Sequence, residues 1–183
     1  MFLQANPNSL NGMRNVILCT ALALLWSLHG LGQGPGSGSC VTPIHPFSQY
    51  EEGANTHKEA LNNALTTYDM SQALAQLKEY WDGVLNDVYQ DLIHTLECRA
   101  SNDERDETGP DEINPSLKMI EALRKGQRAW IQVRDADAEF GYYESFGGSM
   151  ASLSRTGIVL AKTKERAEEL LQMNNNLKDP GGR

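Results

Sequence analysis

The sequence predicts an all-α protein, an antiparallel bundle of three main helices plus one short N-terminal helix. Between residues 56 and 176, apolar residues recur at spacings of three and four, which is the period of an amphipathic helix. No segment shows the sustained period-two alternation of a half-buried strand. The connections between the periodic segments are short, and short connections favour antiparallel neighbours.

The helical domain is preceded by a lead-in and begins with a short helix. Residues 40–55 contain Pro43 and Pro46 and are predicted to be extended. Thr56 and Glu59 have the spacing of a capping box, which predicts that a short helix starts there. The apolar face of this helix is expected to consist of Ala60, Leu61, Ala64, Leu65 and Tyr68.

A long amphipathic helix is predicted over roughly 70–99, and Asp69 is suited to cap its N-terminus. Apolar residues recur along one face of this helix throughout its length. They are Leu74, Leu77, Trp81, Val84, Leu85, Val88, Leu92 and Leu96. This face is the predicted centre of the hydrophobic core.

The next helix is predicted to start at Asn114 and Pro115 and to run to about residue 143. Asn is a favoured N-cap, and Pro fits the first helical position because its missing N–H is not needed there. The inner face of this helix is expected to hold Leu117, Ile120, Leu123, Trp130, Ile131, Arg134 and Phe140.

A turn at Gly147 and Gly148 separates this helix from the last one, which Ser149 is available to cap. The last helix is predicted to end near residues 174–176, and residues 177–183 are predicted to be a disordered tail. The inner side of the last helix is expected to consist of Leu153, Leu160, Ala167, Leu170 and Leu171.

Residues 1–39 have the layout of a secretory signal peptide followed by a Gly/Ser-rich leader. Arg14 precedes an apolar run of roughly 13 positions, and small residues follow that run. A bilayer-spanning helix needs about 20 apolar residues, so we expect no stable membrane anchor. Gly34 and Ser39 both suit signal cleavage, and the sequence leaves the choice between them open. The expectation is an exported protein whose helical domain spans 56–176.

Removal of the leader would leave two cysteines, Cys40 and Cys98. Two cysteines in an exported chain favour one disulfide, because the compartments outside the cytosol are oxidising. The alternatives are two free thiols, or a disulfide between two chains.

The charge of the chain favours a cationic partner. The sequence has 16 Lys and Arg against 24 Asp and Glu, a net charge of −8. This balance argues against a nucleic-acid binder and against electrostatic docking on anionic lipid. A polar loop over 99–113 concentrates acidic residues, and its first four are Asp103, Glu104, Asp106 and Glu107. The simplest interpretation of this loop is a solvated surface, and the functional one is electrostatic attraction of a basic protein.

No pattern in the sequence indicates catalysis, a metal site or a cofactor. Ser149 follows two glycines, but a reactive serine of the nucleophile-elbow type needs a strand before it, and no strand is predicted. His94 and Cys98 are four residues apart on a helix, and two further ligands with matched spacing are missing. We therefore expect a protein that is not an enzyme and that needs no cofactor and no metal.

Trp130 and Arg134 are also four residues apart, so the guanidinium of Arg134 can lie over the indole ring. The structural interpretation is a core aromatic side chain covered by an ion-paired arginine. The functional interpretation is an exposed Trp and Arg pair that binds a protein partner.

A set of residues spread over the three long predicted helices resembles the LprI-type lysozyme inhibitor family. The set comprises Leu85, Asn86, Tyr89, Gln127, Trp130, Arg134, Asp135, Gly147, Gly148 and Ser149. The resemblance covers about residues 66–173. It implies a small exported helical protein of the bacterial periplasm or cell envelope that binds and inhibits lysozyme-type peptidoglycan hydrolases.

The chain departs from the family pattern at three cysteine positions, where it has Ala73, Ala138 and Ile158. Ala138 and Ile158 are consistent with an apolar contact between the last two helices in place of a disulfide. The first functional hypothesis is an inhibitor of a basic lysozyme-like hydrolase, with an immunity protein against a secreted cell-wall-degrading toxin as a variant. The second is a non-catalytic envelope scaffold or stress-related protein without a hydrolase target. The sequence leaves the oligomeric state open.

Overall fold

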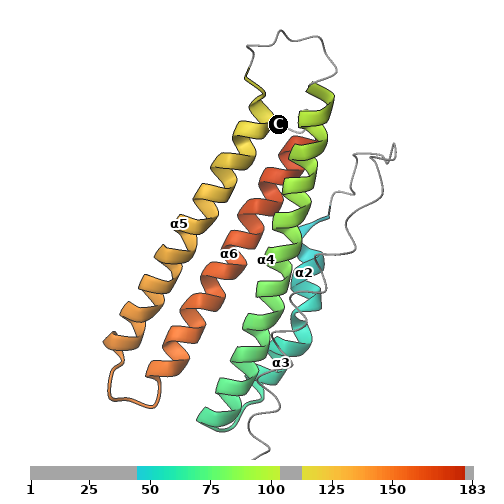
Figure 1. Ribbon diagram of the computed structural model, residues 1–183. Helices are drawn as coiled ribbons and strands as arrows, with labels where there is room; N and C mark the ends of the chain where they lie inside the picture. Colours follow the sequence, from blue (N-terminus) through green and yellow to red (C-terminus); the bar gives the residue numbers. More distant parts are fainter. Residues whose placement is uncertain (1–44, 104–112, 180–183) are drawn as a thin grey trace, which may run out of the picture. The chain divides into compact units, whose positions relative to one another are not determined.

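The computed structural model describes residues 45–103 and 113–179, and every regular element in these two ranges is an α-helix (Figure 1). This confirms the all-α class. Two short helices precede three long ones: α2 (Phe47–Gly53), α3 (Asn55–Asn62), α4 (Thr67–Asp103), α5 (Pro115–Glu144) and α6 (Ala151–Lys178).

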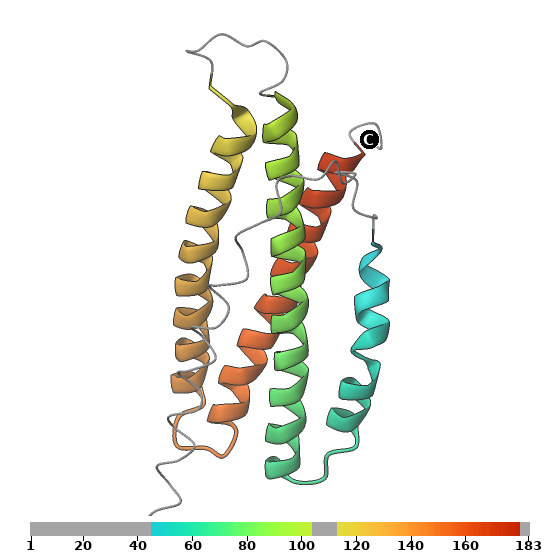
Figure 2. The ribbon, with the colours of Figure 1, turned by 45° about the vertical axis from the view of Figure 1, so that its right-hand side comes forward.

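The three long helices lie side by side, and α6 makes most of the contacts among them. Figures 1 and 2 show α6 next to both α4 and α5. The contacts of α6 with α4 are the most extensive, those of α6 with α5 come next, and α4 and α5 touch each other least. None of the described helices has the length and hydropathy that a bilayer span requires.

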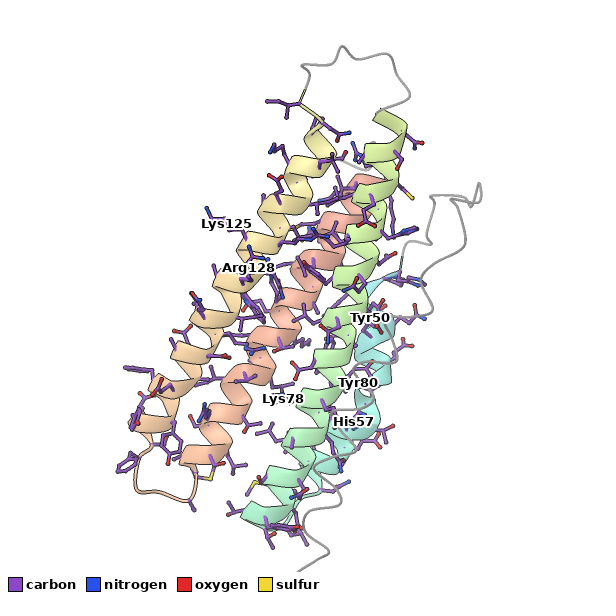
Figure 3. All side chains as sticks on the ribbon, viewed as in Figure 1. Tyr50, His57, Lys78, Tyr80, Lys125 and Arg128 are labelled. Carbon is purple, nitrogen blue, oxygen red and sulfur yellow. The ribbon has the colours of Figure 1, made fainter. Side chains whose placement is uncertain are left out.

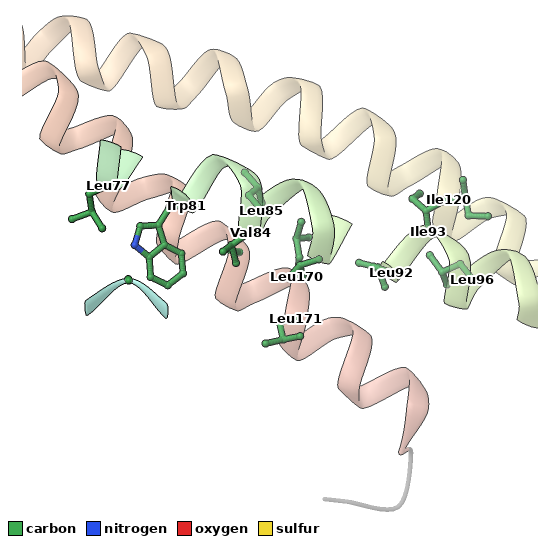
Figure 4. Packing of buried hydrophobic residues seen from close by; sticks show 13 residues of the cluster. Leu77, Trp81, Val84, Leu85, Leu92, Ile93, Leu96, Ile120, Leu170 and Leu171 are labelled. Carbon is green, nitrogen blue, oxygen red and sulfur yellow. The ribbon is translucent and has the colours of Figure 1, made fainter. Parts of the chain in front are cut away.

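The predicted apolar face of the long helix forms the centre of the core. All eight of its residues are buried, with at most 9% of each side chain exposed. Figure 4 shows Trp81 of α4 beside the α6 ribbon, on which Leu170 and Leu171 lie, and Leu96 near Ile120 of α5. The prediction was accurate here because a long apolar stripe with helical period is shielded from water only when that face of the helix packs against other helices.

Trp81 is the largest of the fully buried side chains and joins three helices. Its ring lies 5.5 Å from the ring of Phe47 on α2. The ammonium group of Lys164 on α6 lies 5.5 Å from the Trp81 ring and pairs with Glu51 of α2 at 2.6 Å. The hydrogen bond from Lys164 lowers the pKa of the Glu51 carboxyl below its usual value. The indole is thus packed between α2, α4 and α6.

The prediction of an extended lead-in over 40–55 is wrong for residues 47–53, which form α2. Phe47 and Tyr50 pack against the core, and the hydroxyl of Tyr80 donates a 2.8 Å hydrogen bond to the carbonyl of Tyr50. Figure 3 shows Tyr50, His57 and Tyr80 close together where α2 and α3 meet α4. These contacts with distant residues stabilise a helix that the local sequence does not favour.

The predicted short helix begins and ends earlier than expected. It starts at Asn55, so Thr56 lies inside it and does not cap it, and it ends at Asn62. Leu65 and Tyr68 therefore fall outside α3, and 93% and 71% of their surfaces are exposed instead of buried.

The N-caps of the long helices differ from the sequence prediction in two cases out of three. Asn114 caps α5 as predicted, because its side chain accepts a hydrogen bond from the Leu117 N–H at 3.1 Å. At α4 the residue that accepts the N–H of Asp69 is Thr66, at 3.1 Å, so Asp69 is the capped residue. At α6 the N-cap position is Met150, without a side-chain hydrogen bond, and Ser149 is exposed.

The inner face predicted for α5 is only partly buried. Ile120 is 5% exposed, but Leu117, Ile131 and Phe140 are 45%, 39% and 72% exposed. The reason is that α5 packs chiefly on one neighbour, α6, so its buried stripe is narrow. At the α5–α6 contact Ala138 is buried, and the space beside Gly141 is filled by Ile158. Ile158 therefore packs on α5 at Gly141, and a contact between Ile158 and Ala138 stays a prediction.

A buried polar network fastens the end of α6 to α4. The Asp91 carboxylate accepts hydrogen bonds from the Lys178 ammonium at 2.8 Å and from the Asn174 amide at 2.6 Å. Asn174 is fully buried, and the Lys178 side chain is 5% exposed. The helix α6 continues to Lys178, past the predicted end at 174–176, and this last residue of α6 pairs with the Asp91 carboxylate.

We expect Trp81→Ala to lower the free energy of unfolding by about 3–5 kcal/mol, because it removes a buried indole that α2, α4 and α6 share. Trp130→Ala is the matched control and should cost less, since Trp130 is half-buried. Urea denaturation followed by circular dichroism measures both. Equal losses in the two variants would contradict the central position of Trp81.

We expect Asp91→Ala to cost about 2–3 kcal/mol, because it takes the carboxylate away from a buried lysine and a buried amide. Asp87→Ala, an exposed carboxylate one turn earlier on α4, should stay within about 0.5 kcal/mol of the parent. Adding Lys178→Met to Asp91→Ala should restore part of the loss. Strictly additive effects of these two substitutions would rule out the buried pair.

Candidate partner-binding surface

The residues of the family pattern are spread over the structure: one lies in the core, three meet at a groove, and the others lie further along α5 and at the turn that follows it. Leu85 is a core residue, 5% exposed. Asn86 and Tyr89 of α4 meet Gln127 of α5 in a groove with a volume of about 390 Å³. We call this the cationic groove, and its lining residues are Asn86, Tyr89, Gln90, Arg124, Gln127, Arg128 and Ile131.

The side chain of Gln127 is held in place from α6. Its carbonyl oxygen accepts a 3.1 Å hydrogen bond from the Nε of Arg166. Arg166 in turn pairs with Glu169 at 2.8 Å, and its side chain is 13% exposed. Because the carbonyl oxygen is engaged with Arg166, the amide NH₂ group of Gln127 is the part that remains for other partners.

Trp130 and Arg134 adopt the geometry that their spacing predicts. The guanidinium carbon of Arg134 lies 5.1 Å from the centre of the Trp130 ring, and Arg134 pairs with Asp135 at 2.8 Å. Trp130 is half-buried and packs against the core. This arrangement gives both side chains a place in the fold, and a role for them in binding a partner stays a prediction.

The acidic loop and the predicted disulfide fall largely outside the described residues. Asp103 is the last residue of α4, whereas Glu104, Asp106 and Glu107 lie in the undescribed range, as does Cys40. Cys98 is half-buried on α4, with its Sγ 3.8 Å from the Nε2 of His94. The Cys40–Cys98 disulfide therefore stays a prediction.

Gly147, Gly148 and Ser149 form the exposed turn between α5 and α6. Gly147 has a φ of +83°, in the left-handed region that L-residues with a side chain rarely adopt. The Gly-Gly pattern is thus explained by backbone geometry at the turn.

Next to this turn, aromatic side chains gather on the surface. The rings of Tyr142, Tyr143 and Phe146 lie 5.4–6.0 Å from one another. Phe140 and Met150 are close in sequence to these three and are also exposed. We call these five residues the aromatic end of α5; Phe140, Tyr143 and Phe146 are 72%, 60% and 69% exposed. Exposed aromatic side chains of this kind are typical of surfaces that bind proteins.

The aromatic end was not predicted from the sequence, because helical periodicity assigned Phe140 to the inner face and gave the other four residues no functional role. The signal that was available is their density: five large apolar side chains within eleven positions around a Gly-Gly turn.

The charges on α5 are divided along its length. Residues 115–128 carry four basic residues and one acidic residue, and residues 129–144 carry four acidic residues and one basic residue. In the second half, the ammonium group of Lys162 on α6 donates a hydrogen bond to the Asp137 carboxylate, with 2.6 Å between nitrogen and oxygen. This bond raises the pKa of the ammonium group. Glu139 and Glu144 remain exposed beside the aromatic end. This end of α5 therefore combines apolar rings with negative charge.

The other hollow of note is an apolar groove of about 470 Å³ between the three long helices. It is lined mainly by Leu92, Leu96, Met119, Leu123, Met173 and Leu177. Within the two described ranges, no three His, Cys, Asp or Glu side chains come close enough together to hold a metal ion.

Comparisons with known proteins identify the family. The chain is 41% identical over 54 residues to an uncharacterized protein of Rhizobium meliloti (strain 1021); this match covers 30% of the chain and 39% of that relative. No solved structure matches the chain. The family profile described as "Lysozyme inhibitor LprI" matches residues 58–170, from within α3 to near the end of α6. The chain therefore belongs to the LprI lysozyme inhibitor family.

Proposed function

We propose that this protein is exported to the bacterial periplasm or cell envelope and inhibits a lysozyme-type peptidoglycan hydrolase by binding it. The observation that carries the proposal is the family match over residues 58–170, which includes α4, α5 and most of α6. Residues 1–39 would be removed as signal peptide and leader. Protection of the producing cell against a secreted cell-wall-degrading toxin is a variant of the same activity.

The bundle is proposed to act as a rigid support. We infer that α4, α5 and α6 form the antiparallel bundle that the short connections predict, with α2 and α3 packed on α4. The pairwise contacts of the long helices, the Asp91–Lys178 pair and the Arg166–Gln127 hydrogen bond support this arrangement. A rigid support favours inhibition because less conformational freedom is lost on binding.

The aromatic end of α5 is the proposed contact surface for the hydrolase. Its exposed rings supply the large apolar anchors on which protein interfaces depend. The neighbouring carboxylates of Glu139 and Glu144 suit a basic partner, and lysozyme-type hydrolases are often strongly basic. The acidic loop over 99–113 is proposed to add long-range attraction, which raises the rate of encounter.

The experiment that tests the proposal is a peptidoglycan-lysis assay. The chain without residues 1–39 is titrated against a panel of lysozyme-type hydrolases at low and at physiological salt. Stoichiometric inhibition that persists at physiological salt supports the proposal and identifies the target class. Inhibition that disappears with salt means non-specific attraction between opposite charges. Absence of inhibition at both salt concentrations favours the envelope scaffold instead.

We expect the combined substitutions Phe140→Ser, Tyr143→Ser and Phe146→Ser to weaken inhibition by roughly ten- to a hundredfold, because they remove the apolar anchors. The thermal midpoint should stay near that of the parent, since these side chains are exposed. Leu117→Ser, at the opposite end of α5 and 45% exposed, is the matched control. Full inhibition by the triple variant would exclude the aromatic end as the contact surface.

We expect neutralisation of Asp103, Glu104, Asp106 and Glu107 to amides to slow association with the hydrolase at low salt and to leave dissociation almost unchanged. Stopped-flow or surface plasmon resonance measures both rates. The control removes the same charge from exposed carboxylates on the short helices and α4: Glu52, Glu59, Glu79 and Asp87. Equal slowing in both variants would assign the effect to net charge and remove the loop from the mechanism.

A further inference from the structure

The cationic groove has a property that the proposed function does not use. Arg124 and Arg128 lie one turn apart on α5, and both are exposed. Within residues 45–103 and 113–179, neither arginine has an ion-pair partner, and the same holds for Lys125, which lies between them but outside the groove; Lys118 and Arg134 of the same helix are paired. Like charges four residues apart destabilise a helix. In a chain with an excess of acidic residues, two unpaired arginines at one groove indicate that an anion belongs there.

The rest of the lining indicates what the anion is attached to. Asn86 and Gln90 of α4 and Gln127 of α5 line the groove and carry side-chain amides, and the NH₂ group of Gln127 is not engaged by Arg166. Amides donate and accept hydrogen bonds in pairs, which suits hydroxyl and acetamido groups. Tyr89 and Ile131 add an aromatic ring and an apolar side chain, against which the carbon face of a sugar can pack.

The volume of the groove restricts the size of the ligand. At about 390 Å³ it lies near the lower end of the range for small-molecule sites, roughly 300–1,000 Å³. This volume suits one or two sugar rings.

We propose that the cationic groove binds an anionic saccharide, an acetamido sugar that carries a carboxylate or a phosphate. The two guanidinium groups bind the anionic group, because the planar fork of arginine matches both anions with paired hydrogen bonds. The amides of Asn86, Gln90 and Gln127 bind the sugar. Arg166 is a positioning residue, because it holds the carbonyl end of Gln127 and so turns the NH₂ end to the ligand. This inference does not depend on inhibition of a hydrolase.

Figure 3 places Arg128 and Lys125 on α5, away from the cluster of Tyr50, His57 and Tyr80. Lys125 is exposed but does not line the groove. It therefore offers a control of the same charge on the same helix.

The proposal is tested by calorimetric titration of the full exported chain with four probes. N-acetylmuramic acid combines the acetamido group with a carboxylate, and N-acetylglucosamine 6-phosphate combines it with a phosphate. N-acetylglucosamine lacks the charge, and inorganic phosphate lacks the sugar. We expect one of the two charged sugars to bind saturably at one site, at least tenfold more tightly than the neutral sugar and than phosphate. Which of the two binds identifies the anion.

Two variants decide whether the groove is the site. Arg124→Gln with Arg128→Gln should weaken binding at least tenfold, and Lys118→Gln with Lys125→Gln should change it less than twofold. Asn86→Leu, which keeps both arginines, should weaken binding of the sugar and not that of phosphate. Thermal melts check that each variant is folded. Three results overturn the proposal: no binding of either charged sugar, equal loss in the two double variants, or phosphate binding as tight as that of the sugar.

Sedimentation of the parent and of the arginine variant tests the remaining alternative, in which an acidic surface of a second copy of the chain occupies the groove. A dimer that dissociates on Arg124→Gln with Arg128→Gln, without sugar binding, would make the groove a protein interface and overturn the saccharide. Because the lysis assay is independent of these titrations, failure of the groove proposal and failure of the inhibitor proposal are distinguishable.

Discussion

The structure depends on the burial of one apolar stripe, the face of α4 centred on Trp81. This helix has 37 residues, and its stripe extends from Leu74 to Leu96. A helix with such a stripe is not stable alone in water, because most helical stability in proteins comes from packing of the apolar face. The stripe must therefore pack against other helices. One of these is α6, and another is α2, which contacts Trp81 through Phe47. The remaining long helix, α5, packs mainly on α6, so its other side chains are exposed to solvent.

The predictable part of the fold follows from the same stripe. A pattern that persists for six turns fixes which face of α4 is inside, so the core residues of α4 were predicted accurately. Local patterns fail where a distant residue decides the outcome. Phe47 is helical because it packs on Trp81, 34 positions later, and no local signal reports that contact. Phe140 was predicted to be buried because the sequence around it has an amphipathic pattern. Its exposure instead follows from how little of the α5 surface the neighbouring helices cover.

The candidate sites show a similar division. Three residues of the cationic groove, Asn86, Tyr89 and Gln127, were singled out as members of a family pattern, but their proximity across α4 and α5 comes from tertiary packing. The hydrogen bond from Arg166 explains why a glutamine is suited to position 127, a reason that spacing alone does not give. The separation of charge along α5 places a basic polar groove and an acidic aromatic end on one helix. One partner surface and one ligand surface can therefore coexist without competing for the same side chains.

The limited contact between α4 and α5 has a consequence for the dynamics of the protein. A helix held mainly from one side opens locally at a lower free energy than the helices of the core, and its amide protons exchange with solvent sooner. Both candidate surfaces lie on this helix. A partner or ligand that joins α5 to its neighbours would slow that exchange and would have to offset the entropy of ordering α5. Binding at either surface would thus reduce the flexibility of α5 at the other surface, without any change in the average structure.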